Sequence, residues 1–127
     1  MKKLMMIAAL FTSLYVSADE GVNVGKELDI TNSYIMCGFY GSVSGMDNNS
    51  YAVPAVEVRT FQYAALKHYK ATQKDKTSDT FIVDYAEYVA AQQAVLWDRV
   101  GDNNNTPQKA KQLYRDSNCS MLFDNLK

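Results

Sequence analysis

The stretch Thr80–Val100, TFIVDYAEYVAAQQAVLWDRV, is the longest run of regular hydrophobic periodicity in the chain. Residues three and four apart share one face of an α-helix, and this face holds Ile82, Ala86, Val89, Gln93, Leu96 and Val100. Phe81, Tyr85, Tyr88 and Val95 widen the face, while Asp84, Glu87, Ala91, Ala94 and Asp98 line the opposite side. An apolar arc this wide predicts a helix that is covered on more than one side. Asp79 or Thr80 is expected to cap its start, and Gly101 to stop it.

Two further helix starts carry proline in the first turn, where its missing N–H is not needed. Pro54 begins a helix whose expected buried side is Val58, Phe61, Ala65 and Tyr69. Another face carries Arg59, Lys67, Lys70 and Lys74 around Tyr63, and it is either a solvated face or a surface for an acidic partner. Thr106-Pro107 begins a helix with Ala110, Leu113 and Tyr114 on its apolar side, and the tail Met121–Phe123 is apolar enough to dock.

The segment before residue 46 fits a helix with Val24, Leu28, Ile35, Phe39 and Val43 on one side and an imperfect turn near Thr31–Ser33. Gly38, Ser42 and Gly45 would let a neighbouring backbone approach closely. Sustained period-two alternation and Asn-Gly turns are absent from the sequence. We therefore expect an all-α fold, a small bundle of about four helices formed by residues 19–127.

The first eighteen residues have the layout of a cleaved secretory signal peptide. Lys2 and Lys3 precede an apolar run over Leu4–Val16, and Val16-Ser17-Ala18 offers small residues for cleavage before Asp19. The run is short for a membrane span, and no cysteine follows it that would carry a lipid anchor. We expect an exported, periplasmic protein without a membrane anchor after cleavage.

Charge and cysteine content limit the function classes. The chain has 13 basic and 14 acidic side chains, and loss of Lys2 and Lys3 would leave a net charge of −3. Nucleic-acid binders usually carry a basic excess, so no nucleic-acid partner is expected. Two cysteines in an oxidising compartment predict a Cys37–Cys119 disulfide joining the first helix to the last, with two buried free thiols as the alternative.

Sequence motifs for catalysis are missing. His68 is the single histidine, and a packed or half-exposed imidazole is a more common role for it than metal ligation. The chain has no Gly-x-Ser-x-Gly elbow and no phosphate-binding glycine loop. Glu20, Glu27, Glu57 and Glu87 are present, but their spacing does not predict a facing pair. We expect no enzymatic activity, no metal and no cofactor.

The run Cys37-Gly38-Phe39-Tyr40-Gly41-Ser42-Val43-Ser44-Gly45 follows a Cys-x-aromatic-aromatic-Gly-x-Val pattern. Together with the Lys-Lys leader, the helical domain and the long-range cysteine pair, it resembles periplasmic immunity proteins of type VI secretion systems. Members with this motif usually have a Cys-Pro unit at the next helix, where this chain has Val53-Pro54.

The resemblance implies a protein that binds and occludes a cognate peptidoglycan-degrading effector without catalysis. The candidate contact residues are Asp47, Asn48, Asn49, Ser50 and Tyr51 in a polar stretch, followed by Glu57 and Val58. Alternatively, these residues form a solvated connector and an ordinary first helical turn.

Functions from other classes stay open beside this one. They are a small periplasmic chaperone or acid-stress protein, an accessory protein of an envelope complex, and a secreted hydrolase. A homodimer is also possible.

Overall fold

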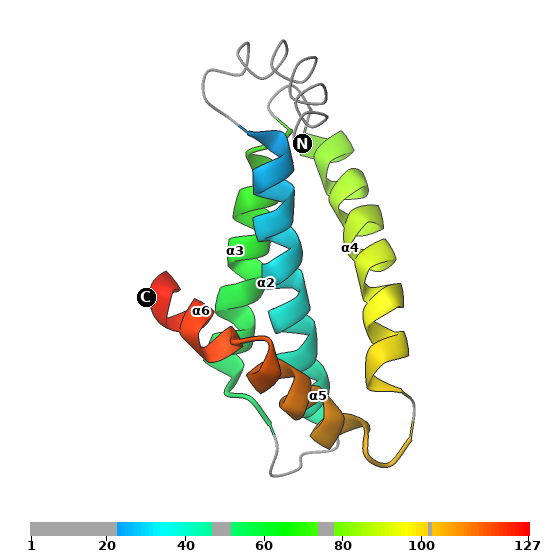
Figure 1. The fold of residues 1–127 in the computed structure, drawn as a ribbon. Helices are drawn as coiled ribbons and strands as arrows, with labels where there is room; N and C mark the ends of the chain where they lie inside the picture. The colour runs from blue at the N-terminus through cyan, green and yellow to red at the C-terminus, as the bar shows by residue number, and fades with distance from the viewer. Residues whose placement is uncertain (1–22, 47–51, 74–77, 102) are drawn as a thin grey trace, which may run out of the picture.

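The computed structural model describes residues 23–46, 52–73, 78–101 and 103–127 (Figure 1). They form five helices: α2 (Val24–Ser44), α3 (Ala55–Lys70), α4 (Ser78–Val100), α5 (Thr106–Asp116) and α6 (Cys119–Leu126). No strand occurs in these four ranges, so the all-α class is confirmed. The count exceeds the expected four because the C-terminal tail, predicted to dock, forms a helix of its own.

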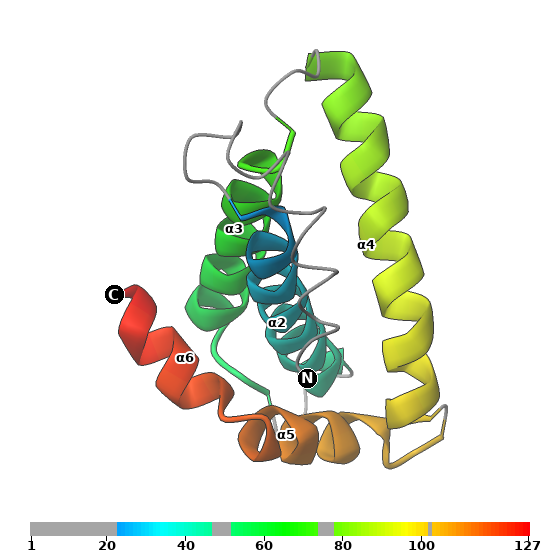
Figure 2. The ribbon, with the colours of Figure 1, turned by 45° about the horizontal axis from the view of Figure 1, so that its top comes forward.

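Helices α2 and α3 lie side by side and antiparallel, with α2 at the centre of the molecule (Figures 1 and 2). Helix α4 runs along the other side of α2, again antiparallel to α3. Helix α5 crosses the end of this bundle at which α2 and α4 finish, and α6 continues from it along α3. The layout is a three-helix bundle closed at one end by a two-helix arm.

Helix α2 is one continuous helix through the region where an imperfect turn was expected. Asn23 caps its start by accepting a hydrogen bond from the Lys26 amide at 3.0 Å. The hydroxyl of Thr31 donates to the Glu27 carbonyl at 2.7 Å, and Ser33 donates to the Asp29 carbonyl at 3.2 Å. These hydroxyl groups find partners within the helix, so they do not break it.

Glycines on α2 bring α3 close, as the sequence predicted for Gly38. A methyl group at Gly38 would lie 3.5 Å from Phe61 Cβ and from Gln62 Cγ, at ordinary contact distance. The closest approach is at Gly41, which was not predicted: a methyl group there would lie 2.9 Å from Val58 Cγ2. Ser42, by contrast, is exposed, and Gly45 follows the end of the helix.

The core lies where α2, α3, the end of α4 and α5 meet. Its fully or nearly fully buried members come from all five described helices and from Val53, just before α3. They include Tyr40, Val53, Phe61, Ala65, Val100, Ala110, Tyr114 and both cysteines. The predicted inner faces of α3 and α5 are confirmed, because Phe61, Ala65, Tyr69, Ala110 and Tyr114 are all buried.

Helix α4 differs from its prediction. Leu96 and Val100 are buried as expected, but Ile82, placed on the inner face by the periodicity, is 63% exposed. The described helices cover α4 on one side only, toward α2 and α3, so the expected cover on more than one side is not found among the described residues. The start of α4 packs through aromatic rings instead, with Tyr69 of α3 lying 4.9–5.8 Å from Phe81, Tyr85 and Tyr88.

Two turns direct the C-terminal arm. Gly101 has φ +78°, a left-handed value that favours glycine, and it ends α4 as predicted. Thr106, where the sequence predicted a helix to begin, is the first residue of α5, and its hydroxyl closes the turn by donating to the Gly101 carbonyl at 3.0 Å. Asn118, with φ +59°, then separates α5 from α6.

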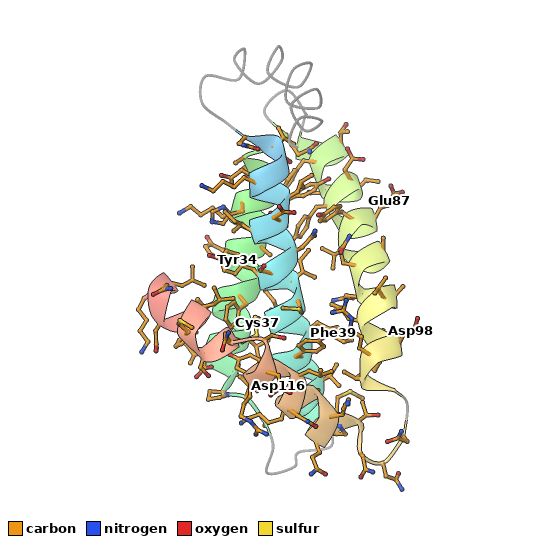
Figure 3. The ribbon with its side chains drawn as sticks, in the orientation of Figure 1. Tyr34, Cys37, Phe39, Glu87, Asp98 and Asp116 are labelled. Atoms are coloured by element: carbon orange, nitrogen blue, oxygen red, sulfur yellow. A yellow bond between two sulfur atoms is a disulfide. The ribbon has the colours of Figure 1, made fainter. Side chains whose placement is uncertain are left out.

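The predicted disulfide is confirmed. Cys37 of α2 and Cys119 at the start of α6 are bonded, with their Cα atoms 5.6 Å apart across 82 positions of sequence. Both residues are fully buried. The bond therefore ties the C-terminal arm directly to the central helix (Figure 3).

Candidate partner-binding site

The predicted contact residues Asp47 to Tyr51 lie outside the described residues, but the chain on either side of them is well defined. Ser44, at the end of α2, is buried, and its hydroxyl donates to the Gly41 carbonyl at 2.6 Å. The same hydroxyl accepts a hydrogen bond from the Val53 amide at 2.9 Å. One buried side chain thus joins the two ends from which residues 47–51 extend.

Glu57 is half-buried and linked to the C-terminal arm rather than free. Its Oε1 accepts a hydrogen bond from the Tyr114 hydroxyl at 2.7 Å. Burial, this hydrogen bond and the nearby carboxylate charge raise the pKa of Tyr114 above its usual value of 10.0. The contact was not predicted, because the two residues are 57 positions apart and neither belongs to a recognisable motif.

Val58 is half-buried and packs against Gly41. The structure therefore brings Glu57 and Val58 together as supports for the first turn of α3. Met46 and Val56, on either side of residues 47–51, are exposed apolar residues. We call Met46 and Val56 the α2–α3 edge.

The outer face of α3 is separate from these supports. Tyr63 is 75% exposed, and Arg59, Lys67 and Lys70 are exposed around it. Lys74, the last member of the predicted basic stripe, lies outside the described residues. A shallow recess of about 470 Å³ lies between this face and Leu126 of α6. Arg59, Lys67 and Lys70 therefore lie on an exposed face, which fits both a solvated face and a surface for an acidic partner.

His68 is half-buried, as expected for a packed imidazole. Its Nδ1 lies 2.7 Å from Glu27 Oε1, and its ring lies 5.5 Å from the ring of Tyr34. This pair links α3 to the first turns of α2. Within the described ranges, no three His, Cys, Asp or Glu side chains are placed to hold a metal ion.

A groove of about 430 Å³ lies between α2, α3 and α4. Its lining is mainly apolar, with Phe39, Val43, Leu66, Val89 and Trp97 among its walls. Phe39 extends from α2 toward α4, where its ring meets that of Trp97 edge-on at 5.1 Å (Figure 3). Sequence reasoning missed this groove because its walls come from three helices that are distant in sequence.

The remaining observations concern membranes and known proteins. None of the helices formed by the described residues has the length and apolar character needed to span a bilayer. Comparisons with protein-family models, curated proteins and solved structures find no match to this chain.

Proposed function

We propose that this protein is a periplasmic immunity protein that binds and blocks a peptidoglycan-degrading effector of a type VI secretion system. The proposal starts from the secretory layout of residues 1–18 and the motif-like run Cys37–Gly45. A buried disulfide is compatible with an exported protein. The role is stoichiometric binding rather than catalysis.

The observation that carries the proposal is the set of contacts that joins the end of α2 to the start of α3. Ser44 joins the end of α2 to Val53 through buried hydrogen bonds, and Gly41 packs against Val58. Glu57 fastens the same turn to Tyr114. A segment held at both ends loses less conformational freedom on binding, which favours tight inhibition.

Within this proposal, the contact residues are Asp47 to Tyr51 together with Met46 and Val56. Tyr51 is the proposed anchor, because a tyrosine offers apolar area and a hydrogen-bonding tip at low entropic cost. Glu57 and Val58, proposed from the sequence as direct contacts, act by positioning the edge. Their substitution is expected to lower stability as well as inhibition.

The test uses the hydrolase encoded beside the gene for this protein and measures solubilisation of purified peptidoglycan. The wild-type protein should abolish hydrolysis at about one molecule per molecule of hydrolase. Tyr51→Ala should weaken inhibition many-fold while leaving the thermal unfolding transition nearly unchanged.

The control variants are Arg59→Ala, Lys67→Ala and Lys70→Ala, on the basic outer face of α3. They should inhibit as well as wild type. If they lose inhibition while Tyr51→Ala retains it, the contact surface is the outer face of α3. If no adjacent hydrolase exists and no peptidoglycan hydrolase is inhibited, the immunity function is wrong.

A second candidate, a periplasmic chaperone, is favoured by one observation. Helix α4 exposes large apolar side chains, including Ile82 and Val83, that a chaperone would use to hold unfolded clients. Suppression of the aggregation of an acid-unfolded periplasmic protein would support this function, and its absence would exclude it.

A further inference from the structure

The outer face of α3 gathers positive charge in one row. Arg59, Lys67 and Lys70 fall within an arc of about 80° at 100° per residue, and Tyr63 lies between them. All four side chains are exposed. The row extends about 16 Å along the helix axis, at 1.5 Å per residue. The whole chain has a net charge of −1, so this face departs from the overall charge balance.

No carboxylate neutralises this row among the residues that the structure describes. Within those ranges, none of the three cations belongs to an ion pair. The acidic side chains closest to α3 are engaged elsewhere, because Glu27 is paired with His68 and Glu57 accepts a hydrogen bond from Tyr114. The positive charge of the row is therefore available to a partner.

The stability of α3 explains only part of the row. Cations near the carboxyl end of a helix are favoured by the helix dipole, which accounts for Lys67 and Lys70 in the last turn. These two lysines are three positions apart, however, and like charges at that spacing repel. Arg59 lies in the second turn, where the dipole offers a cation no advantage.

The same face contains a recess that can receive an apolar side chain. Its volume is about 470 Å³, and Ala64 and Leu126 are among its apolar walls. Leu126 reaches this position because α6 ends beside α3 on the side away from α4 (Figures 1 and 2). Arg59 and Lys67 also line the recess. Apolar surface and positive charge are thus combined in one place.

We propose that the outer face of α3 binds an acidic segment of a partner protein. Carboxylates of that segment pair with Arg59, Lys67 and Lys70, and one of its apolar side chains enters the recess beside Leu126. A row of about 16 Å is longer than one small anion, and it matches about three turns of helix or five extended residues. Tyr63, in the middle of the row, is of a residue type enriched among the side chains that dominate binding energy.

A bilayer surface fits this face less well than a protein segment does. A helix that lies on a membrane buries a broad apolar face between its cations. Between Arg59 and Lys70, Tyr63 is the only large apolar side chain that is exposed. The other apolar surface, at Ala64 and Leu126, lines a recess, where a single side chain can reach it.

Fluorescence anisotropy with a synthetic peptide tests the proposal. The probe is a labelled peptide of about twelve residues, made of glutamates with one central leucine, and it is titrated with the exported form of the protein. Wild type should bind it, with an affinity that falls many-fold as ionic strength rises, because salt screens exposed charges. The same peptide with glutamine in place of glutamate should not bind. Failure of the acidic peptide to bind at low salt overturns the proposal.

Two charge-matched variants separate this face from the net charge of the protein. The first carries glutamine in place of all three cations of the row and should bind the acidic peptide many-fold more weakly. The second loses three exposed cations of α2 and α5 and should bind nearly as well as wild type. Its substitutions are Lys26→Gln, Lys109→Gln and Arg115→Gln. Equal weakening in both variants would mean that the peptide responds to net charge alone, which overturns the proposal.

The recess is tested without changing any charge. Serine in place of the central leucine should weaken binding of the peptide to wild type several-fold, and Tyr63→Ala should weaken binding of the leucine peptide. Equal affinity of the two peptides for wild type overturns the proposed use of the recess. Binding to phosphatidylglycerol vesicles without binding to the peptide would identify a membrane surface instead and overturn the proposal. No hydrolase is present in these experiments, so their outcome is independent of the immunity function.

Discussion

At the scale of single residues, two glycines on one helix have different surroundings. Gly41 faces Val58, whose branched side chain has little freedom to move. Gly38 faces atoms at ordinary contact distance. We expect Gly41→Ala to lower the free energy of unfolding by about 1–3 kcal/mol through overpacking.

Gly38→Ala is the matched control for that prediction. It should leave the free energy of unfolding unchanged or raise it by up to about 1 kcal/mol, because alanine is the better helix former. Urea denaturation of both variants measures the difference. Equal destabilisation by the two substitutions would show that the contact between Gly41 and Val58 is not the cause.

The Tyr114 hydroxyl is the second residue-scale feature with a testable consequence. Tyr114→Phe removes the donor to half-buried Glu57, and we expect the free energy of unfolding to fall by about 1–3 kcal/mol. The raised pKa of Tyr114 means that the folded state favours the neutral phenol. This contribution is complete below the unfolded pKa of about 10 and is lost as the pH rises above it.

Denaturation at neutral pH and above pH 10 should therefore show a larger alkaline loss for wild type than for Tyr114→Phe. Tyr85 and Tyr88, whose pKa values burial also raises, are present in both proteins and contribute equally. Parallel alkaline loss in the two proteins would contradict the prediction.

At the scale of elements, we expect the docking of α6 onto the rest of the molecule to depend on the disulfide. It is a short helix, and Met121 on its surface is exposed while Leu122 and Phe123 are only partly buried. Cys37→Ser or Cys119→Ser should lower the free energy of unfolding by about 2–4 kcal/mol. Addition of reductant should lower the denaturation midpoint of wild type and leave that of either variant unchanged. A midpoint of wild type that does not respond to reductant would contradict this.

We expect the packing of the first turns of α4 to depend on one aromatic side chain of α3. Tyr69 is buried and contacts Phe81, Tyr85 and Tyr88, while the Tyr88 hydroxyl donates to Asn32 of α2. Tyr69→Ala should lower the free energy of unfolding by about 3 kcal/mol. Amide hydrogen exchange should accelerate in residues 81–89 more than in residues 92–100, which are held by buried Leu96 and Val100.

Tyr63→Ala is the control for this element. It removes a tyrosine from the same helix, but one that is largely exposed, so the free energy of unfolding should change by less than about 0.5 kcal/mol. Uniform acceleration of exchange along α4 in Tyr69→Ala would show that the helix opens as one unit.

At the scale of the whole molecule, the first eighteen residues carry a testable prediction of export. The layout of residues 1–18 predicts a mature chain that begins at Asp19. Mass spectrometry of the periplasmic fraction should find this amino terminus, together with a mass two hydrogens below that of the reduced chain. Protein recovered from the periplasm with Met1 intact would contradict the prediction of cleavage.

Most of the fold could be predicted from local patterns. Apolar residues three and four positions apart, proline at helix starts and glycine after Val100 indicated the helices, and two cysteines behind a secretory leader layout indicated the disulfide. The predictions from sequence were wrong where the burial of a residue depends on which other helices lie beside it. Ile82 has the periodicity of a core residue but is exposed, since no described element lies against that side of α4.

The sequence by itself determined the helical class, the positions of most helices and the pairing of Cys37 with Cys119. The helices follow from local propensity and the disulfide follows from the presence of two cysteines, and neither property requires coordinates. Only the tertiary structure decided that Glu57 is hydrogen-bonded to Tyr114, that Gly41 lies closer to α3 than Gly38 does, and that the described helices leave one side of α4 uncovered. Each of these depends on which distant segments meet, and that is set by packing of the whole chain rather than by spacing within one helix.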